Sequence, residues 1–116
     1  MKIKITLNDA VITATLIDSE TARDFMSLLP LTLTLEDYGD TEKVSDLPRG
    51  LSTEGAPAGY EPSVGDITYY SPWGNLAIFI KDFRYSDGLV PLGKIDGGID
   101  AFDISGSLNA TIELVE

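Results

Sequence analysis

The sequence contains no cysteine and no histidine among its 116 residues. Without cysteine there is no disulfide, thiol nucleophile or thiolate ligand, and without histidine there is no imidazole base. Zinc sites built from these two residues are excluded as well. A metal would have to be held by oxygen atoms alone, and neither a calcium-loop nor a phosphate-loop pattern is present. We therefore expect neither a metal nor a cofactor.

Basic residues are scarce. Lysine and arginine total 8 against 19 aspartates and glutamates, which gives a formal net charge of −11. Phosphate backbones and anionic lipid repel such a chain, so we expect neither nucleic acid nor a membrane surface as a partner. Acidic residues are concentrated between Glu36 and Asp66, where the basic residues are Lys43 and Arg49. This acidic segment is either a solvated face or a rim that attracts a cationic ligand.

Long apolar runs are missing too, since the longest covers residues 76–80 and is too short to span a bilayer. Residues 3–7 alternate apolar and polar side chains, unlike the continuous apolar core of a signal peptide. As written, the sequence predicts a soluble, cytoplasmic chain, and a secreted chain trimmed of its leader would have the same pattern. The length suits one domain, assigned to residues 1–116.

Alternating apolar residues predict a mainly β fold of six to eight strands. A helix of about three turns is predicted after a cap at Asp18 or Ser19, and Pro30 ends it. One helical turn is predicted at 99–102, and Pro91 is interpreted as an edge-strand proline. The predicted strands cover residues 1–7, 10–17, 31–38, 66–70, 75–81, 89–95 and 107–115, with one short edge strand at 42–47.

The predicted strands at 66–70 and 75–81 form a central hairpin around the turn Pro72-Trp73-Gly74-Asn75. We expect the two strands to belong to the hydrophobic core, because Ile67, Leu76, Ile78 and Ile80 are apolar. The long Gly- and Pro-rich stretch from Gly39 to Val64 is the best candidate for a binding loop, because stretches of this length in small domains are usually functional. We expect a ligand to lie between this loop and the Trp-bearing tip.

The order of these elements resembles the cyclophilins. Residues 20–25, Glu-Thr-Ala-Arg-Asp-Phe, are similar to the K-T-A-x-N-F helix of that family, and 92–100 are similar to its F-G-K-V-x-x-G-M-D segment. Residues 65–80 resemble the G-D-I-x-Y-x-x-P-x-G pattern of small bacterial cyclophilin-like domains of unassigned function. The resemblance covers nearly the full length. It implies a small closed or nearly closed cyclophilin-like β-barrel with one or two short helices.

The isomerase motif of that family is not matched. Cyclophilins isomerise X-Pro bonds with an arginine in F-H-R-x-x-x-x-F-M-x-Q-G-G-D, and Arg49 is the arginine in the corresponding region. Glu54 stands in place of the phenylalanine and Pro57 in place of the glutamine, and no Q-G-G-D follows. We therefore assign no catalytic residues.

Aromatic residues give the best signal for a site. Alternation puts Tyr69 and Tyr70 on opposite faces of their strand, so at most one of the pair lines any single pocket. The rings are interpreted either as core packing or as a groove for a peptide or small ligand. Arg49 forms either a structural ion pair or an anchor for a ligand carboxylate. The predicted ligand-binding residues are Arg49, Tyr60, Tyr69, Trp73, Phe79 and Tyr38.

The sequence therefore favours a non-catalytic domain that binds a small molecule or a peptide, including a proline-containing one. The alternative is a weak peptidyl-prolyl isomerase that uses Arg49. A hydrolase based on paired carboxylates is a third hypothesis, with Glu36 and Asp37 as one candidate pair. Its other candidates are Asp96, Asp100 and Asp103.

Overall fold

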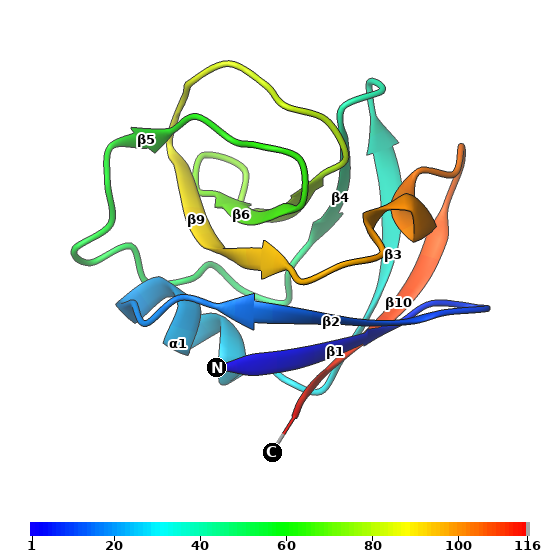
Figure 1. Cartoon of the computed structure of the whole chain (residues 1–116). Coiled ribbons are helices and arrows are strands. Elements are labelled where there is room, and N and C mark those ends of the chain that lie inside the picture. Colours follow the sequence, from blue (N-terminus) through cyan, green and yellow to red (C-terminus); the bar gives the residue numbers. More distant parts are fainter. Residues whose placement is uncertain (116) are drawn as a thin grey trace.

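A computed structural model describes residues 1–115 and contains a closed antiparallel barrel of eight strands in the order β1-β10-β3-β4-β7-β6-β9-β2 (Figure 1). The mainly β prediction and the barrel implied by the family resemblance are both confirmed. Two further strands, β5 (Gly59–Tyr60) and β8 (Ser86–Asp87), form a separate two-stranded sheet. The barrel strands are β1 (Lys2–Thr6), β2 (Val11–Leu16), β3 (Leu31–Tyr38), β4 (Glu42–Asp46), β6 (Asp66–Tyr70), β7 (Asn75–Phe79), β9 (Leu89–Ile95) and β10 (Leu108–Leu114).

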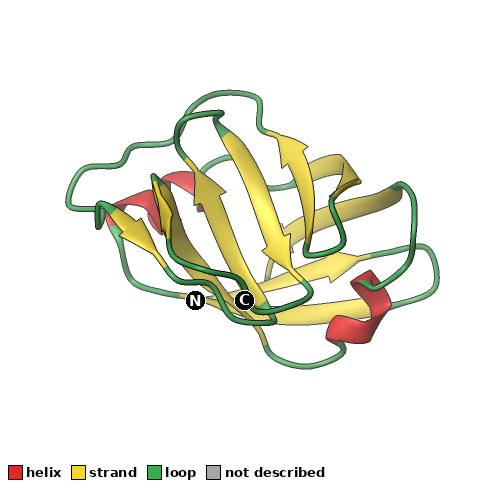
Figure 2. Ribbon diagram, turned by 90° about the horizontal axis from the view of Figure 1, so that it is seen from above, coloured by secondary structure: helices red, strands yellow, loops and turns green. Residues whose placement is uncertain are grey.

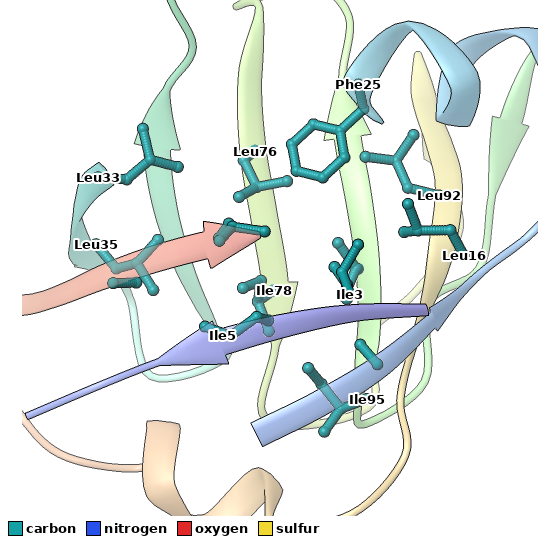
Figure 3. Close-up of a cluster of buried hydrophobic side chains, with 14 of the residues drawn as sticks. Ile3, Ile5, Leu16, Phe25, Leu33, Leu35, Leu76, Ile78, Leu92 and Ile95 are labelled. Atoms are coloured by element: carbon teal, nitrogen blue, oxygen red, sulfur yellow. The ribbon is translucent and has the colours of Figure 1, made fainter. Parts of the chain in front are cut away.

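Side chains fill the interior of the barrel. Alternate residues of each strand point inward, and Ile3, Ile78 and Leu92 are completely buried (Figure 3). An eight-stranded barrel is just wide enough for its inward side chains to fill it. A ligand site must therefore lie on the outside of the barrel or at one of its ends.

Helix α1 (Glu20–Met26) adds Phe25 to this interior, where its ring lies near Leu76 and Leu92 (Figure 3). Ser19 caps the helix, because its hydroxyl accepts a hydrogen bond from the Ala22 N–H at 3.1 Å. The helix has seven residues, so it is shorter than the three turns that the sequence predicts. A short 3-10 helix, η1 (Ile99–Phe102), lies on the opposite side of the barrel from α1 (Figure 2).

Two of the sequence-based predictions about edge strands are wrong. Strand β4 lies between β3 and β7 inside the closed sheet, and β9 lies between β6 and β2. Pro91 lies at a register shift in the β6–β9 pairing, where Ile67 is opposite Gly93 and Thr68 is opposite Pro91. Such irregularities are places where a sheet accommodates proline. The barrel has no open edge, since β1 pairs with both β2 and β10.

The other barrel strands lie at their predicted positions, whereas the sequence predicts no strand at β5 or β8. The β1–β2 hairpin turns at Asn8 and Asp9, with the Leu7 N–H donating to the Ala10 carbonyl at 2.8 Å. Strands β3 and β9 have the predicted bounds, and the 3-10 helix replaces the predicted helical turn. Among residues 1–115, no helix is long and apolar enough to cross a membrane.

Candidate functional site

A cavity of about 220 Å³ opens on the outside of the barrel, and aromatic rings form much of its wall. We call it the aromatic pocket. Strands β3, β4, β6, β7 and β9 contribute to it, together with the hairpin tip and the segment before β9. The residues that line it are Tyr38, Glu42, Val44, Tyr70, Trp73, Asn75, Phe79, Phe83, Arg84, Ser86 and Leu89.

Strand alternation brings these side chains to the outer face. In β7, Leu76 and Ile78 belong to the interior core, so Asn75, Ala77 and Phe79 point outward. The buried residues Ala77, Phe79 and Leu89 form a second, smaller apolar cluster on this face. Phe83 stacks on Phe79 with ring centroids 6.2 Å apart, and so the segment before β9 covers part of the cluster.

Trp73 stands at the tip of the β6–β7 hairpin. Gly74 has a φ of 67°, a left-handed conformation that suits glycine, and its N–H donates to the Tyr70 carbonyl at 2.9 Å. The Trp73 ring lies edge-on between Tyr38 and Tyr70, with centroid distances of 5.7 Å and 5.3 Å. It nevertheless remains 60% exposed. The turn therefore holds a large aromatic surface at the mouth of the pocket.

The pocket also contains a carboxylate without an ionic partner and an amide oxygen without a hydrogen-bond partner among the described residues. Glu42 is half-buried and forms no ion pair with any lysine or arginine of residues 1–115. Its burial raises the pKa of the carboxyl group, and the Thr41 side chain offsets part of that rise. Asn75 is 6% exposed, and its buried Oδ1 is without a hydrogen-bond partner among the described residues.

Three of the six predicted ligand-binding residues meet in this pocket: Trp73, Phe79 and Tyr38. Tyr69 points into the barrel interior, where it is 3% exposed and its hydroxyl oxygen accepts the Leu51 N–H at 3.0 Å. Tyr60 packs against the outer cluster without lining the pocket. Its hydroxyl donates to Asp66 at 2.8 Å, and burial together with that carboxylate raises the pKa of Tyr60 to about 12.

Arg49 lies away from the aromatic pocket and pairs with α1. Its two terminal nitrogens donate to the two carboxylate oxygens of Asp24 at 3.0 Å and 2.8 Å. The Ser52 N–H donates to the same carboxylate at 2.7 Å. These hydrogen bonds lower the pKa of Asp24 to about 2, with the Arg49 contribution the largest. Arg23 of α1 pairs with Asp18 and with Glu20 of the same helix.

Three of the five carboxylates of the hydrolase hypothesis, those of Glu36, Asp37 and Asp96, are held by neighbouring side chains. Glu36 accepts a hydrogen bond from the Ser107 hydroxyl, and Asp37 pairs with the buried Lys43 at 2.7 Å. Asp96 accepts hydrogen bonds from Lys2 and Thr15, both at 2.7 Å. No cluster of three or more potential metal-ligating side chains occurs within residues 1–115.

The sequence-based site prediction does not include Tyr70, Glu42, Asn75, Phe83 or Arg84. Alternation could have identified Tyr70, because Ile67 is a core residue and Tyr69 shares its face while Tyr70 does not. The other four depend on long-range pairing. Glu42, for example, lies opposite Tyr38 on one side and Phe79 on the other, a register that local pattern does not encode.

Comparisons with known proteins agree with this architecture. Residues 5–113 match the Cyclophilin-like family. The fold is similar to the solution structure of the hypothetical protein AF2241 from Archaeoglobus fulgidus, with a TM-score of 0.72 and 17% identity. That match covers 99% of this chain and 95% of the other. No curated protein has significant sequence similarity to the chain.

Proposed function

Because the chain belongs to the Cyclophilin-like family and its barrel interior is filled, we propose that it is a non-catalytic domain that binds a small molecule or a peptide in the aromatic pocket. The observation that supports this most is the exposed Trp73 ring, held between Tyr38 and Tyr70 beside a cavity. Large aromatic side chains left exposed at a concave site are typical of binding surfaces. No residue of the pocket is assigned a catalytic role.

The size of the pocket restricts the ligand. Pockets for drug-sized molecules are roughly 300–1,000 Å³, and this one measures about 220 Å³. It therefore suits one side chain of a peptide, or a compact molecule of similar size. A proline ring or another short side chain falls within this range.

The test is a fluorescence and NMR titration with compact small molecules and short peptides, some of them containing proline. A genuine ligand should change Trp73 fluorescence, and Trp73→Ala should weaken its binding about tenfold or more. Val11→Ala is the control, because Val11 is 62% exposed on β2, which contributes no residue to the pocket. A ligand that leaves Trp73 fluorescence unchanged while shifting resonances elsewhere would move the site away from this pocket.

A weak prolyl isomerase is the second candidate, and the position of Arg84 favours it. Its guanidinium group lies 4.7 Å from the Phe83 ring centroid on the wall of the pocket. A cation beside a bound prolyl amide draws charge from the nitrogen and lowers the rotation barrier of about 18–20 kcal/mol. Arg49, the arginine that the sequence suggests, is held by Asp24 instead.

A prolyl-peptide assay separates the two candidates. Isomerisation that is lost in Arg84→Ala and kept in Arg49→Ala would replace the non-catalytic proposal with an enzymatic one. Unaccelerated isomerisation in the presence of wild-type protein, together with binding of the same peptide, would support the binding domain. Acceleration lost in Arg49→Ala instead would assign the activity to a site outside the pocket.

A further inference from the structure

The carboxylate of Glu42 is the acidic group of the aromatic pocket and is without an ionic partner among residues 1–115. The carboxylates of Asp24 and Asp37, by contrast, are paired with Arg49 and Lys43. Removing a carboxylate from water without a compensating cation is unfavourable. A ligand with a positive charge would provide the missing partner.

Aromatic residues flank Glu42 on both sides. Strand register places it opposite Tyr38 of β3 and opposite Phe79 of β7, and both rings line the pocket. The Trp73 ring makes angles of 75° and 83° with Tyr38 and Tyr70, so the walls near the mouth are roughly perpendicular to one another. The negative faces of aromatic rings attract cations, and several rings around a carboxylate form a cage for an ammonium group.

Asn75 supplies an acceptor that a ligand donor would satisfy. Its Oδ1 is buried and unpartnered among the described residues, although buried amide oxygens normally accept hydrogen bonds. A quaternary ammonium group carries no N–H and would leave this oxygen unpaired. An ammonium group with N–H donors can hydrogen-bond to the Glu42 carboxylate, which a quaternary group cannot do. Asn75 lies opposite Asp46 in the β4–β7 register, whereas Glu42 lies opposite Phe79, so a second donor of the ligand, such as a peptide N–H, would have to reach the Asn75 Oδ1.

Taking the binding function proposed above as its basis, we propose that the aromatic pocket binds a primary alkylammonium group. The group belongs either to a lysine side chain of a peptide or to a free aliphatic amine. At roughly 30 Å³ for each water-sized group, the cavity of about 220 Å³ has space for a short aliphatic stem as well as the charged head. The net charge of −11 favours the approach of such a cation over long distances.

Arg84 is a cation on the wall of the aromatic pocket, and its guanidinium group is an example of a cation bound to an aromatic ring of this pocket. Its guanidinium lies over the Phe83 ring and forms no ion pair with a carboxylate of residues 1–115. This side chain repels an incoming ammonium group and covers one aromatic face. Its removal should therefore strengthen binding of a cation and weaken binding of an anion.

The experiment measures binding by Trp73 fluorescence and by NMR for five probes. They are Nα-acetyl-lysine methylamide, its Nε-acetylated neutral counterpart, n-butylammonium, tetramethylammonium and propionate. We expect the lysine derivative and n-butylammonium to bind, and the other three to bind at least about tenfold more weakly. Tighter binding of the lysine derivative than of n-butylammonium identifies a peptide ligand, and equal binding identifies a free amine.

Three variants accompany the probes. Glu42→Gln should weaken ammonium binding at least about tenfold, because the isosteric amide keeps the shape and removes the charge. Glu54→Gln is its matched control, since it makes the same change in net charge at an exposed loop position outside the pocket. Arg84→Ala should strengthen ammonium binding several-fold. Urea denaturation of each variant verifies that it is folded.

Two results would overturn the inference in different ways. Trp73-dependent binding of the neutral probe or of propionate, unaffected by Glu42→Gln, would contradict the selectivity for an ammonium group. It would still support the proposed binding function of the aromatic pocket. Failure of all five probes to bind, in wild type and in Arg84→Ala, would reject the cation as well. A parallel titration with proline-containing peptides then tests whether the aromatic pocket binds a ligand at all. A Trp73-dependent response to these peptides would support the proposed binding function without the cation.

Discussion

Lys43 is completely buried, and its ammonium group connects β4 to the segment that follows η1. It donates hydrogen bonds to the carbonyl oxygens of Ile104 and Gly106 and pairs with the Asp37 carboxylate at 2.7 Å. Asp37 in turn accepts the Gly106 N–H at 2.7 Å, and these contacts with Lys43 and Gly106 lower its pKa. All three donors of the ammonium group are used, so its burial is fully compensated.

Replacing Lys43 should therefore destabilise the fold. Lys43→Met keeps most of the aliphatic volume but leaves two carbonyls and a carboxylate without their donor. We expect the free energy of unfolding to fall by about 2–3 kcal/mol, because water can still reach Asp37, which is 37% exposed. Urea denaturation measures the change.

Lys81→Met is the matched control for this prediction. Lys81 forms an exposed ion pair with Asp40, and such pairs contribute about 0–1 kcal/mol. An equal effect of the two substitutions would show that burial of Lys43 is unimportant. Combining Lys43→Met with Asp37→Asn should recover part of the lost free energy of unfolding, because the unpaired carboxylate is then removed.

At the level of elements, α1 and the loop between β4 and β5 are held together by one carboxylate. Asp24 accepts hydrogen bonds from Arg49 and from the Ser52 N–H, and Arg49 also donates to the Ser27 hydroxyl at 3.0 Å. The Leu51 N–H extends this attachment to Tyr69 in the barrel. The loop is therefore anchored to the scaffold at several points, despite its glycines and prolines.

Asp24→Asn should loosen this loop without unfolding the barrel. We expect a loss of about 1–2 kcal/mol in the free energy of unfolding, because charge-assisted hydrogen bonds become neutral. Hydrogen exchange should increase at Leu51 and Ser52. Asp46→Asn is the control, since Asp46 is exposed and forms no ion pair with a described basic residue. Unchanged exchange at Leu51 and Ser52 would show that other contacts hold the loop.

The pH dependence of this effect has a defined sign. The pKa of Asp24 is lowered from 3.8 to about 2, so the folded state favours the ionised form. Its stabilisation is complete above about pH 4 and is lost as the pH falls from 3.8 towards 2. The difference in stability between wild type and Asp24→Asn should therefore shrink across this window. A difference that stays constant down to pH 2 would contradict it.

At the level of the whole molecule, closure of the sheet into a barrel gives it an inner face that packs the core and an outer face that carries the candidate binding site. Inward-facing residues form the main core, whereas the aromatic pocket uses residues of the outer face. The likeness to the Archaeoglobus fulgidus protein, at 17% identity, concerns the fold. A shared fold does not define the site, because one fold supports many different sites, and in this chain the candidate site lies on the outer face.

Elements whose signals are local can be predicted from the amino-acid sequence. Alternation in β3 and β10, a helix cap at Asp18 or Ser19 and the hairpin turn at Trp73 can each be identified from neighbouring residues, and the structure selects Ser19 as the cap. Alternation also places Tyr69 and Tyr70 on opposite faces of β6, and the structure puts Tyr69 in the core and Tyr70 in the pocket. The barrel was expected from the resemblance of ordered motifs, and the structure confirmed it.

Tertiary structure alone decided which distant residues meet. Sequence pattern left Arg49 with two interpretations, an ion pair or a ligand anchor, and only the packing of α1 against the loop brings Asp24 to it. The sequence pattern also predicts β4 as an edge strand. The structure pairs β4 with β7, and this pairing depends on closure of the barrel. The Glu42 carboxylate joins the aromatic pocket for the same reason. Strand register is set by long-range contacts, which no single stretch of sequence contains.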